Sequence, residues 1–170
     1  MTLKRIVDII YSVPTLLYVI LIMLIFGSNM FSVRLAICIS SWIGLARQVR
    51  ALVMAQKEQE YALAARVIGA SDMRILFRHL VKNSIGPIIV NTTLMVPSAI
   101  FTEAFLSFVG IGISIPMASW GTMANDAKNM LFSQPLQMVW PVSAICLTML
   151  ALNFIGDGLN QALDPKKRSR

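Results

Sequence analysis

Four long stretches without a charged side chain constrain this chain more than any other feature of its sequence. They run over residues 9–33, 35–46, 83–102 and 129–156, and the third resumes after Glu103. A helix needs roughly 20 apolar residues to cross a bilayer, and the second stretch is shorter than that. We expect an all-α, polytopic membrane protein in which residues 1–170 form a single domain.

The composition agrees with this class. The mean hydropathy is +0.70, with 56% hydrophobic and 14% charged residues. The net charge of +7 comes from basic residues that stand between the apolar runs without interleaved aromatic residues, so we expect a lipid bilayer and no nucleic acid as partner. Cys38 and Cys146 lie in separate apolar runs, where we expect them to pack as small hydrophobic side chains.

The distribution of basic residues predicts the topology. If residues 35–46 cross the membrane, starting near Phe31 after a turn over residues 27–32, only Arg34 and Lys128 of the fifteen basic residues lie outside. This gives about four transmembrane helices, cytoplasmic amino and carboxyl termini, and a cytoplasmic loop over about residues 47–83. Four prolines are expected to start or kink helices: Pro14, Pro87, Pro97 and Pro141.

The cytoplasmic loop has its own local pattern. Residues 47–68 contain no Gly or Pro and predict one continuous helix that ends at Gly69 in a left-handed conformation. Ser71 and Asp72 then predict the start of a second helix. On that helix one face is expected to pack and another to stay wet. The packing face is Met73, Leu76, Phe77, Leu80 and Val81, and the wet stripe is Arg74, Arg78 and Lys82.

Small residues surround the glycine. Ala62, Ala64, Ala65 and Ala70 leave the backbone around Gly69 thinly covered, which favours close approach by another protein surface. The segment resembles the Glu-Ala-Ala loop of ATP-binding-cassette importer permeases. Ala64, Ala65 and Gly69 match that pattern, whereas Leu63 and Lys82 stand where the pattern has Glu and Pro.

A closer resemblance is to the oligopeptide, dipeptide and nickel branch of these permeases, in its C-type subunits. Four ordered segments carry it: residues 60–71, 103–112, 119–121 and 153–165. The resemblance implies a half-pore that pairs with a second, homologous permease subunit. It also implies two cytoplasmic ATPase subunits and an extracytoplasmic peptide-binding protein. The loop would contact the ATPase through Tyr61, Ala64, Ala65, Arg66, Gly69, Ala70 and Ser71.

The resemblance leaves three matters open. The chain opens after the family's first spans, so it is expected to lack them, as a truncated product or one half of a split subunit. Nickel or another small solute is the alternative cargo, although the sequence has no His or Cys cluster. A fragment that assembles without transporting is the alternative from another class.

One acidic and three polar residues in the third stretch are candidates for a translocation path. Glu103 is expensive at the centre of a bilayer, so it is expected near the outer interface, in a structural role or in contact with substrate. Asn91, Ser98 and Thr102 share a helix face, where they line a path or form interhelical hydrogen bonds.

The sequence offers little basis for catalysis. His79 is the only histidine, and no Gly-x-x-x-x-Gly-Lys-Ser/Thr phosphate cradle occurs. We therefore expect a transport subunit that is not an enzyme, holds no cofactor or metal, and relies on partner subunits for ATP hydrolysis.

Overall fold

The computed structural model describes residues 9–10, 12–113 and 116–163, and within these ranges it is helical without strands. The helices are α2 (Thr15–Phe26), α3 (Met30–Lys57), α4 (Glu60–Val67), α5 (Asp72–Ile75), α6 (Lys82–Val109), α7 (Trp120–Lys128) and α8 (Leu136–Leu163). A π-helical turn, η1 (Leu76–Val81), joins α5 to α6.

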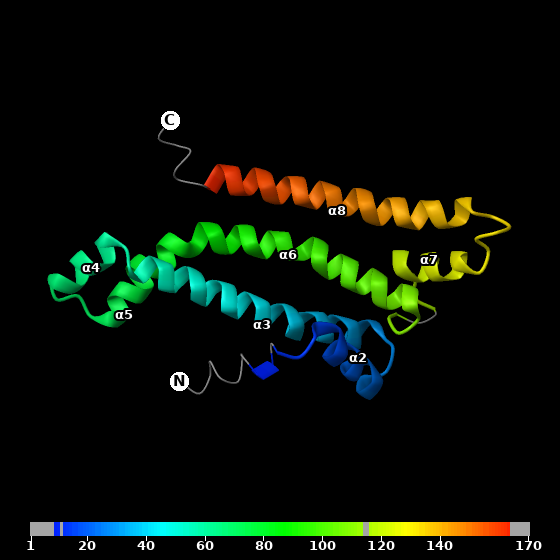
Figure 1. Ribbon diagram of the computed structural model, residues 1–170, viewed down its shortest axis with the longest axis horizontal. Coiled ribbons are helices and arrows are strands. Elements are labelled where there is room, and N and C mark those ends of the chain that lie inside the picture. The colour runs from blue at the N-terminus through cyan, green and yellow to red at the C-terminus, as the bar shows by residue number, and fades with distance from the viewer. Residues whose placement is uncertain (1–8, 11, 114–115, 164–170) are drawn as a thin grey trace.

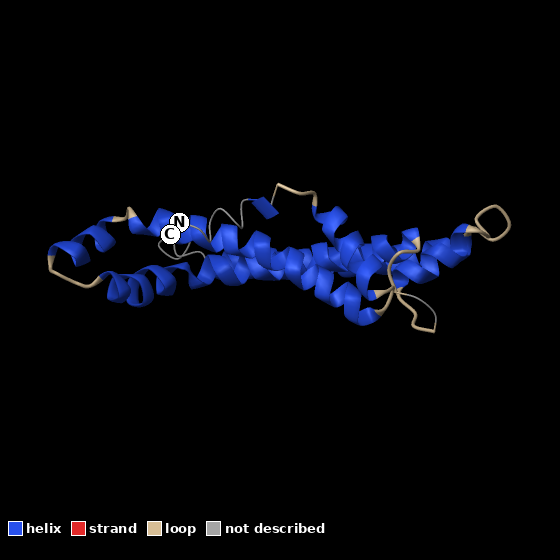
Figure 2. Ribbon diagram, turned by 90° about the horizontal axis from the view of Figure 1, so that it is seen from below, coloured by secondary structure: helices blue, strands red, loops and turns tan. Residues whose placement is uncertain are grey.

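Three long helices form the body of the molecule. α3, α6 and α8 lie side by side, with α4 and α5 at one end and α2 and α7 toward the other (Figure 1). All three are long and apolar enough to cross a membrane. Figure 2 shows the same elongated arrangement from below, with the α4–α5 segment projecting beyond the bundle. The polytopic helical fold expected from the apolar runs is therefore confirmed.

The first apolar run differs from the prediction. Its described part contains α2, of 12 residues, with residues 9–10 helical before it and the start of α3 after it. α2 reaches about 18 Å and is too short for roughly 30 Å of hydrocarbon. Pro14 stands at its N-cap, as expected. The run is broken at Gly27, whose φ of 80° no helical residue adopts.

The turn after α2 is built by side chains. Asn29 caps α3 by accepting a hydrogen bond from the Ser32 amide at 2.9 Å, and its own amide donates to the Phe26 carbonyl at 3.0 Å. The short stretch over residues 35–46 therefore lies inside a helix of 28 residues that begins at Met30. The helix expected to begin near Phe31 is present, and it is long and apolar enough to cross a membrane.

A small core joins α2, α3 and α6 near the α7 end. Val19, Ala36 and Leu106 are almost fully buried together, and Met23, Val33 and Ile113 form a second buried group. These contacts hold the short α2 against the two long helices. The prolines of α6 and α8, Pro87, Pro97 and Pro141, all lie inside their helices.

Close approach sets the position of α7 and α8 on α6. A Cβ added at Gly121 of α7 would lie 2.3 Å from the Ala104 carbonyl oxygen, so a larger residue would push the two backbones apart. One added at Gly156 of α8 would lie 2.5 Å from Leu94 Cδ2, and that side chain would have to move. Small residues therefore fix the helix packing, as is usual in membranes.

Much of the apolar surface is exposed on the isolated chain. In the most apolar 18-residue segment of α8, only 6% is buried inside the molecule. Leu147, Leu150 and Phe154 are among the exposed side chains of this helix. Such a surface requires lipid or other helices around it. Cys38 and Cys146 are free thiols on exposed parts of α3 and α8 in the isolated chain.

Candidate functional site

The α4–α5 loop, defined as residues 58–81, stands at the far end of two long helices. α3 ends at Lys57 and the chain then turns at Glu58 and Gln59, where Gln59 has an extended backbone. The prediction of one continuous helix through Ile68 is therefore wrong. No Gly or Pro marks the break, which instead lets α4 fold back and pack on the second half of the loop.

Gly69 ends α4 as predicted. Its φ is 83°, its amide donates to the Arg66 carbonyl at 3.1 Å, and the Ala70 amide donates to the Ala65 carbonyl at 3.1 Å. This pair of bonds is a Schellman motif, which needs a left-handed residue after the helix. Ser71 is the N-cap residue of α5, but its side chain makes no capping hydrogen bond to a described residue.

The loop has a core of its own. Ala62 and Ala65 on α4 are 3% and 6% exposed and pack against Ile75 and Leu80. Two of the four alanines expected to leave the backbone open therefore serve the internal packing of the loop. Ala64 is exposed and Ala70 is half-buried, so these two remain available at the surface.

The second half of the loop packs through Leu76 and Leu80, which helical spacing selected, and through Ile75, which it did not. Met73 and Phe77, predicted to pack, are 65% and 62% exposed, whereas Ile75 is buried. The physical reason is the π-helical turn, in which residues five apart lie above one another, so Ile75 and Leu80 point to the same side. A standard helical period could not identify that pair.

One side of the loop carries a hollow of about 690 Å³ that gathers most of the predicted contact residues. Of the contact residues predicted from the sequence, five line this hollow: Tyr61, Ala64, Ala65, Gly69 and Ala70. Arg74 and Arg78 add positive charge to the same hollow, and His79 adds an imidazole ring. Tyr61 is held by a hydrogen bond from its hydroxyl to the Gln56 side-chain oxygen at 2.6 Å.

The two other predicted contact residues, Arg66 and Ser71, line a different hollow. It measures about 780 Å³ and also includes Lys57 and Asp72. Arg66 forms an ion pair with Asp72 at 3.7 Å, and both side chains are at least half exposed. A solvated pair of this kind contributes little to stability.

The outermost side chains of the loop are apolar. Val67 and Ile68, in the last residues before the glycine, are 87% and 84% exposed, and Leu63 one turn earlier is 49% exposed. Sequence reasoning did not select Val67 or Ile68. Their position just before a helix-ending glycine could have indicated this exposure, because the chain leaves the helix there and no further helical turn covers the two side chains.

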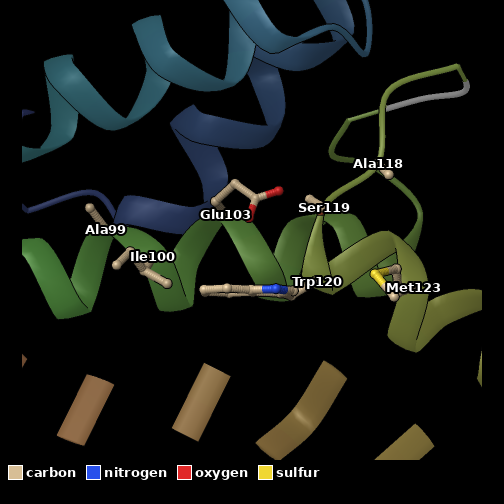
Figure 3. A pocket seen from close by; sticks show the side chains of 7 residues that line it. All are labelled: Ala99, Ile100, Glu103, Ala118, Ser119, Trp120 and Met123. Atoms are coloured by element: carbon tan, nitrogen blue, oxygen red, sulfur yellow. The ribbon is translucent and has the colours of Figure 1, made fainter. Parts of the chain in front are cut away.

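A second candidate site lies at the opposite end of the bundle. A cavity of about 540 Å³ is lined by Ala99, Ile100 and Glu103 from α6 and by Ala118, Ser119, Trp120 and Met123 from the start of α7 and the two residues before it. Figure 3 shows Glu103 projecting from α6 and the flat Trp120 ring lying alongside α6 near Ile100. Glu103 stands in the last two turns of α6, away from the middle of the helix.

Hydrogen bonds fix this end of α6. The Ser107 hydroxyl donates to Glu103 Oε1 at 2.8 Å and accepts a hydrogen bond from the Ile113 amide at 3.1 Å. Ser107 is 1% exposed. The turn is also tied to the α2–α3 connection, because the Ser28 hydroxyl donates to the Ile111 carbonyl at 3.0 Å. Glu103 is therefore part of a turn that is fixed by hydrogen bonds. This turn at the end of α6, residues 103–113, is called the corner below.

The polar residues predicted to accompany Glu103 do not join its cavity. Thr102 donates its hydroxyl to the Ser98 carbonyl of the preceding turn at 2.8 Å, and Ser98 is exposed. Asn91 lies half-buried three turns earlier on α6. The residues that do join Glu103 come from the start of α7. Ser119 and Trp120 belong to the Ser-Trp-Gly segment of the family resemblance, and no spacing rule relates that segment to Glu103.

Among residues 9–10, 12–113 and 116–163 there is no group of three or more His, Cys, Asp or Glu side chains that could hold a metal ion. The candidate sites thus offer a carboxylate and an indole at one end, and apolar tips with positive charge at the other.

Comparison with known proteins identifies the class. The family described as "Binding-protein-dependent transport system inner membrane component" matches residues 1–169. The chain belongs to this family, and its long apolar helices are those of a multi-pass membrane protein.

Particular relatives are also similar. The oligopeptide transport system permease protein OppC of Bacillus subtilis is 49% identical over 164 residues, which are 96% of this chain and 54% of that relative. The dipeptide transport system permease protein DppC of the same organism is 46% identical over 165 residues, 96% of this chain and 52% of that relative. OppC of Escherichia coli K12 is 40% identical over 164 residues, 96% of this chain and 54% of the relative. The chain spans about half the length of the curated relatives it matches.

Proposed function

We propose that this chain is a permease subunit of an ATP-driven importer of oligopeptides or dipeptides. Residues 1–170 act as one permease domain, in which α3, α6 and α8 form part of the translocation path. Similarity to relatives named as oligopeptide and dipeptide permeases supports the cargo class. The chain itself performs no hydrolysis in this proposal and needs no cofactor.

The observation that carries the proposal is the continuity of α5, η1 and α6. Residues Asp72–Val109 form one uninterrupted helical rod of 38 residues, which at 1.5 Å per residue is about 57 Å long. The rod starts in the α4–α5 loop and ends at the corner that holds Glu103 and Ser107. A displacement of the loop can therefore be transmitted to the opposite end of the bundle along one continuous helical backbone, which includes the π-helical turn η1 and the two prolines of α6.

The loop is the proposed contact with the ATPase subunits. The residues assigned to the contact are Tyr61, Ala64, Ala65, Arg66, Gly69, Ala70 and Ser71. Exposed Val67 and Ile68 at the tip supply apolar surface, and the internal core of the loop supplies the rigidity that force transmission requires. Two ATPase subunits, a second homologous permease and an extracytoplasmic peptide-binding protein complete the proposed assembly.

We also propose that the loop and both chain termini face the cytoplasm. Basic residues support this orientation, because Lys57, Arg66, Arg74 and Arg78 lie at the loop end, while the α7 end carries Lys128. Glu103 then lies toward the outer side. We assign it, with Asn91, Ser98 and Thr102 further along α6, to the translocation path or its gate.

Uptake into sealed vesicles tests the function. Vesicles that contain the assembled permeases, ATPases and binding protein should accumulate a labelled tripeptide only when ATP reaches the ATPase side. Nickel uptake measured in parallel provides the comparison with a small cation. ATP-dependent accumulation of nickel without accumulation of any peptide would reject the peptide assignment, and accumulation of neither would reject transport by this assembly.

A further inference from the structure

We propose that the cavity between α6 and α7 binds the primary ammonium group of a peptide during its passage through the importer. The cavity is defined by Glu103, Trp120 and the side chains around them. The proposal rests on the proposed function of peptide import and adds to it a ligand group and the residues that hold it.

The carboxylate of Glu103 is the charged partner for such a group. Ser107 holds one of its oxygens at 2.8 Å, and Ser107 is itself fixed by the Ile113 amide. Fixing one oxygen sets the direction of the side chain and leaves acceptor capacity on both oxygens, because a carboxylate accepts about four hydrogen bonds. Among the residues that the structure describes, those that line the cavity with Glu103 include no lysine or arginine, so none of them neutralises its negative charge.

The wall of the cavity also favours a cation. Trp120 is 39% exposed, and an indole face attracts an ammonium group within about 6 Å of its centroid. Ala99, Ile100 and Met123 surround this pair without adding positive charge. The basic residue of α7, Lys128, lies over the ring of Phe108 at 5.5 Å and does not line the cavity.

The size of the cavity fits one end of a peptide rather than a whole peptide. About 540 Å³ in a hollow open to the outside accommodates an ammonium group and the adjoining residue. Every unmodified peptide carries an amino-terminal ammonium, so recognition of this group is independent of side-chain sequence. A contact of this kind can orient varied peptides in the same direction.

The test compares three labelled peptides in vesicles that contain the complete importer. Trialanine has a free amino terminus, N-acetyl-trialanine lacks it, and N-acetyl-Ala-Lys-Ala carries an ammonium only on its side chain. Glu103→Gln keeps the acceptor for Ser107 and removes the charge. We expect this variant to lower kcat/KM for trialanine about fivefold, and to change kcat/KM for N-acetyl-trialanine by less than about twofold. The fivefold loss corresponds to the upper end of the range for a solvated ion pair.

Matched variants separate binding from structure. Trp120→Leu should lower trialanine uptake selectively and Trp120→Phe should restore most of it, since phenylalanine keeps an aromatic face. Asp126→Asn removes one negative charge from an exposed position on α7 outside the cavity, and it should change all three peptides by less than about twofold.

Each outcome has one reading. A selective loss for trialanine supports the site, and a parallel loss for N-acetyl-Ala-Lys-Ala extends it to side-chain ammonium groups. An equal loss for all three peptides in Glu103→Gln, matched by Ser107→Ala, would show that Glu103 only holds the corner and would overturn the proposal. Unchanged uptake would overturn it as well. If the unaltered importer takes up no peptide with ATP, the proposed function fails instead.

Discussion

Gly69 provides the sharpest prediction for the α4–α5 loop. Its φ of 83° lies in the left-handed region, and a Cβ added there would meet nothing within 4 Å. Gly69→Ala therefore introduces no steric clash with neighbouring residues and changes only the backbone preference. An L-residue in this conformation costs about 1–2 kcal/mol. The equilibrium constant for the observed loop conformation should then fall about 5- to 30-fold.

That penalty should appear directly in ATPase binding. If the ATPase binds the observed loop conformation, its apparent affinity falls by as much as the population of that conformation falls. The assay is titration of purified ATPase onto the immobilised permease pair. Gly69→Ala should shift half-saturation toward higher ATPase concentration, by at most this 5- to 30-fold factor. Gly69→Pro should be more severe, because proline also removes the amide that donates to Arg66.

Two matched substitutions serve as controls. Asn tolerates the left-handed region better than Ala, so Gly69→Asn should bind more tightly than Gly69→Ala. Gly158 in α8 also has open space where a methyl group would stand but is helical, so Gly158→Ala should leave binding unchanged. Binding by Gly69→Ala that equals that of the unaltered chain, or equally poor binding by the Asn and Ala variants, would refute the prediction.

Two further predictions concern packing and topology. Gly121→Ala places a methyl group 2.3 Å from the Ala104 carbonyl oxygen, so α7 must shift. We expect the free energy of unfolding to fall by about 1–3 kcal/mol, which is measured as a lower thermal midpoint in detergent. An unchanged midpoint would contradict the α6–α7 packing. Reporter enzymes fused after Arg74 and after Lys128 should report opposite sides of the membrane, and the same side for both would reject the proposed topology.

The broad fold was predictable because its signals are local. Apolar runs predict the long helices, and the Gly-Ser-Asn segment after Phe26 predicts the turn before α3. Gly69 was predictable for the same reason, since a helix-ending glycine acts through its own backbone. These features depend on residues close together in the chain, and a single sequence contains all of that information.

The remaining features depend on tertiary contacts. Nothing in the local sequence breaks the helix at Gln59, and the break exists because α4 packs Ala62 and Ala65 on Ile75. The π-helical turn η1 brings Leu80 to the same buried cluster as Ile75, while Met73 in α5 lies at the surface. Trp120 lines the same cavity as Glu103 only because α7 folds back on α6. In the first apolar run the prediction was too long. The apolar composition predicts a spanning helix there, whereas α2 has only 12 residues.

The central claim is that the tip of the α4–α5 loop contacts the ATPase. A photo-crosslinking amino acid at position 68, whose native side chain is 84% exposed, tests it in cells that are importing peptide. Position 132, which is fully exposed beyond α7 near the opposite end of the bundle, is the matched control. We predict that position 68 captures the ATPase subunit and position 132 does not. Normal import without capture of the ATPase from position 68, or its capture from position 132, would contradict the account.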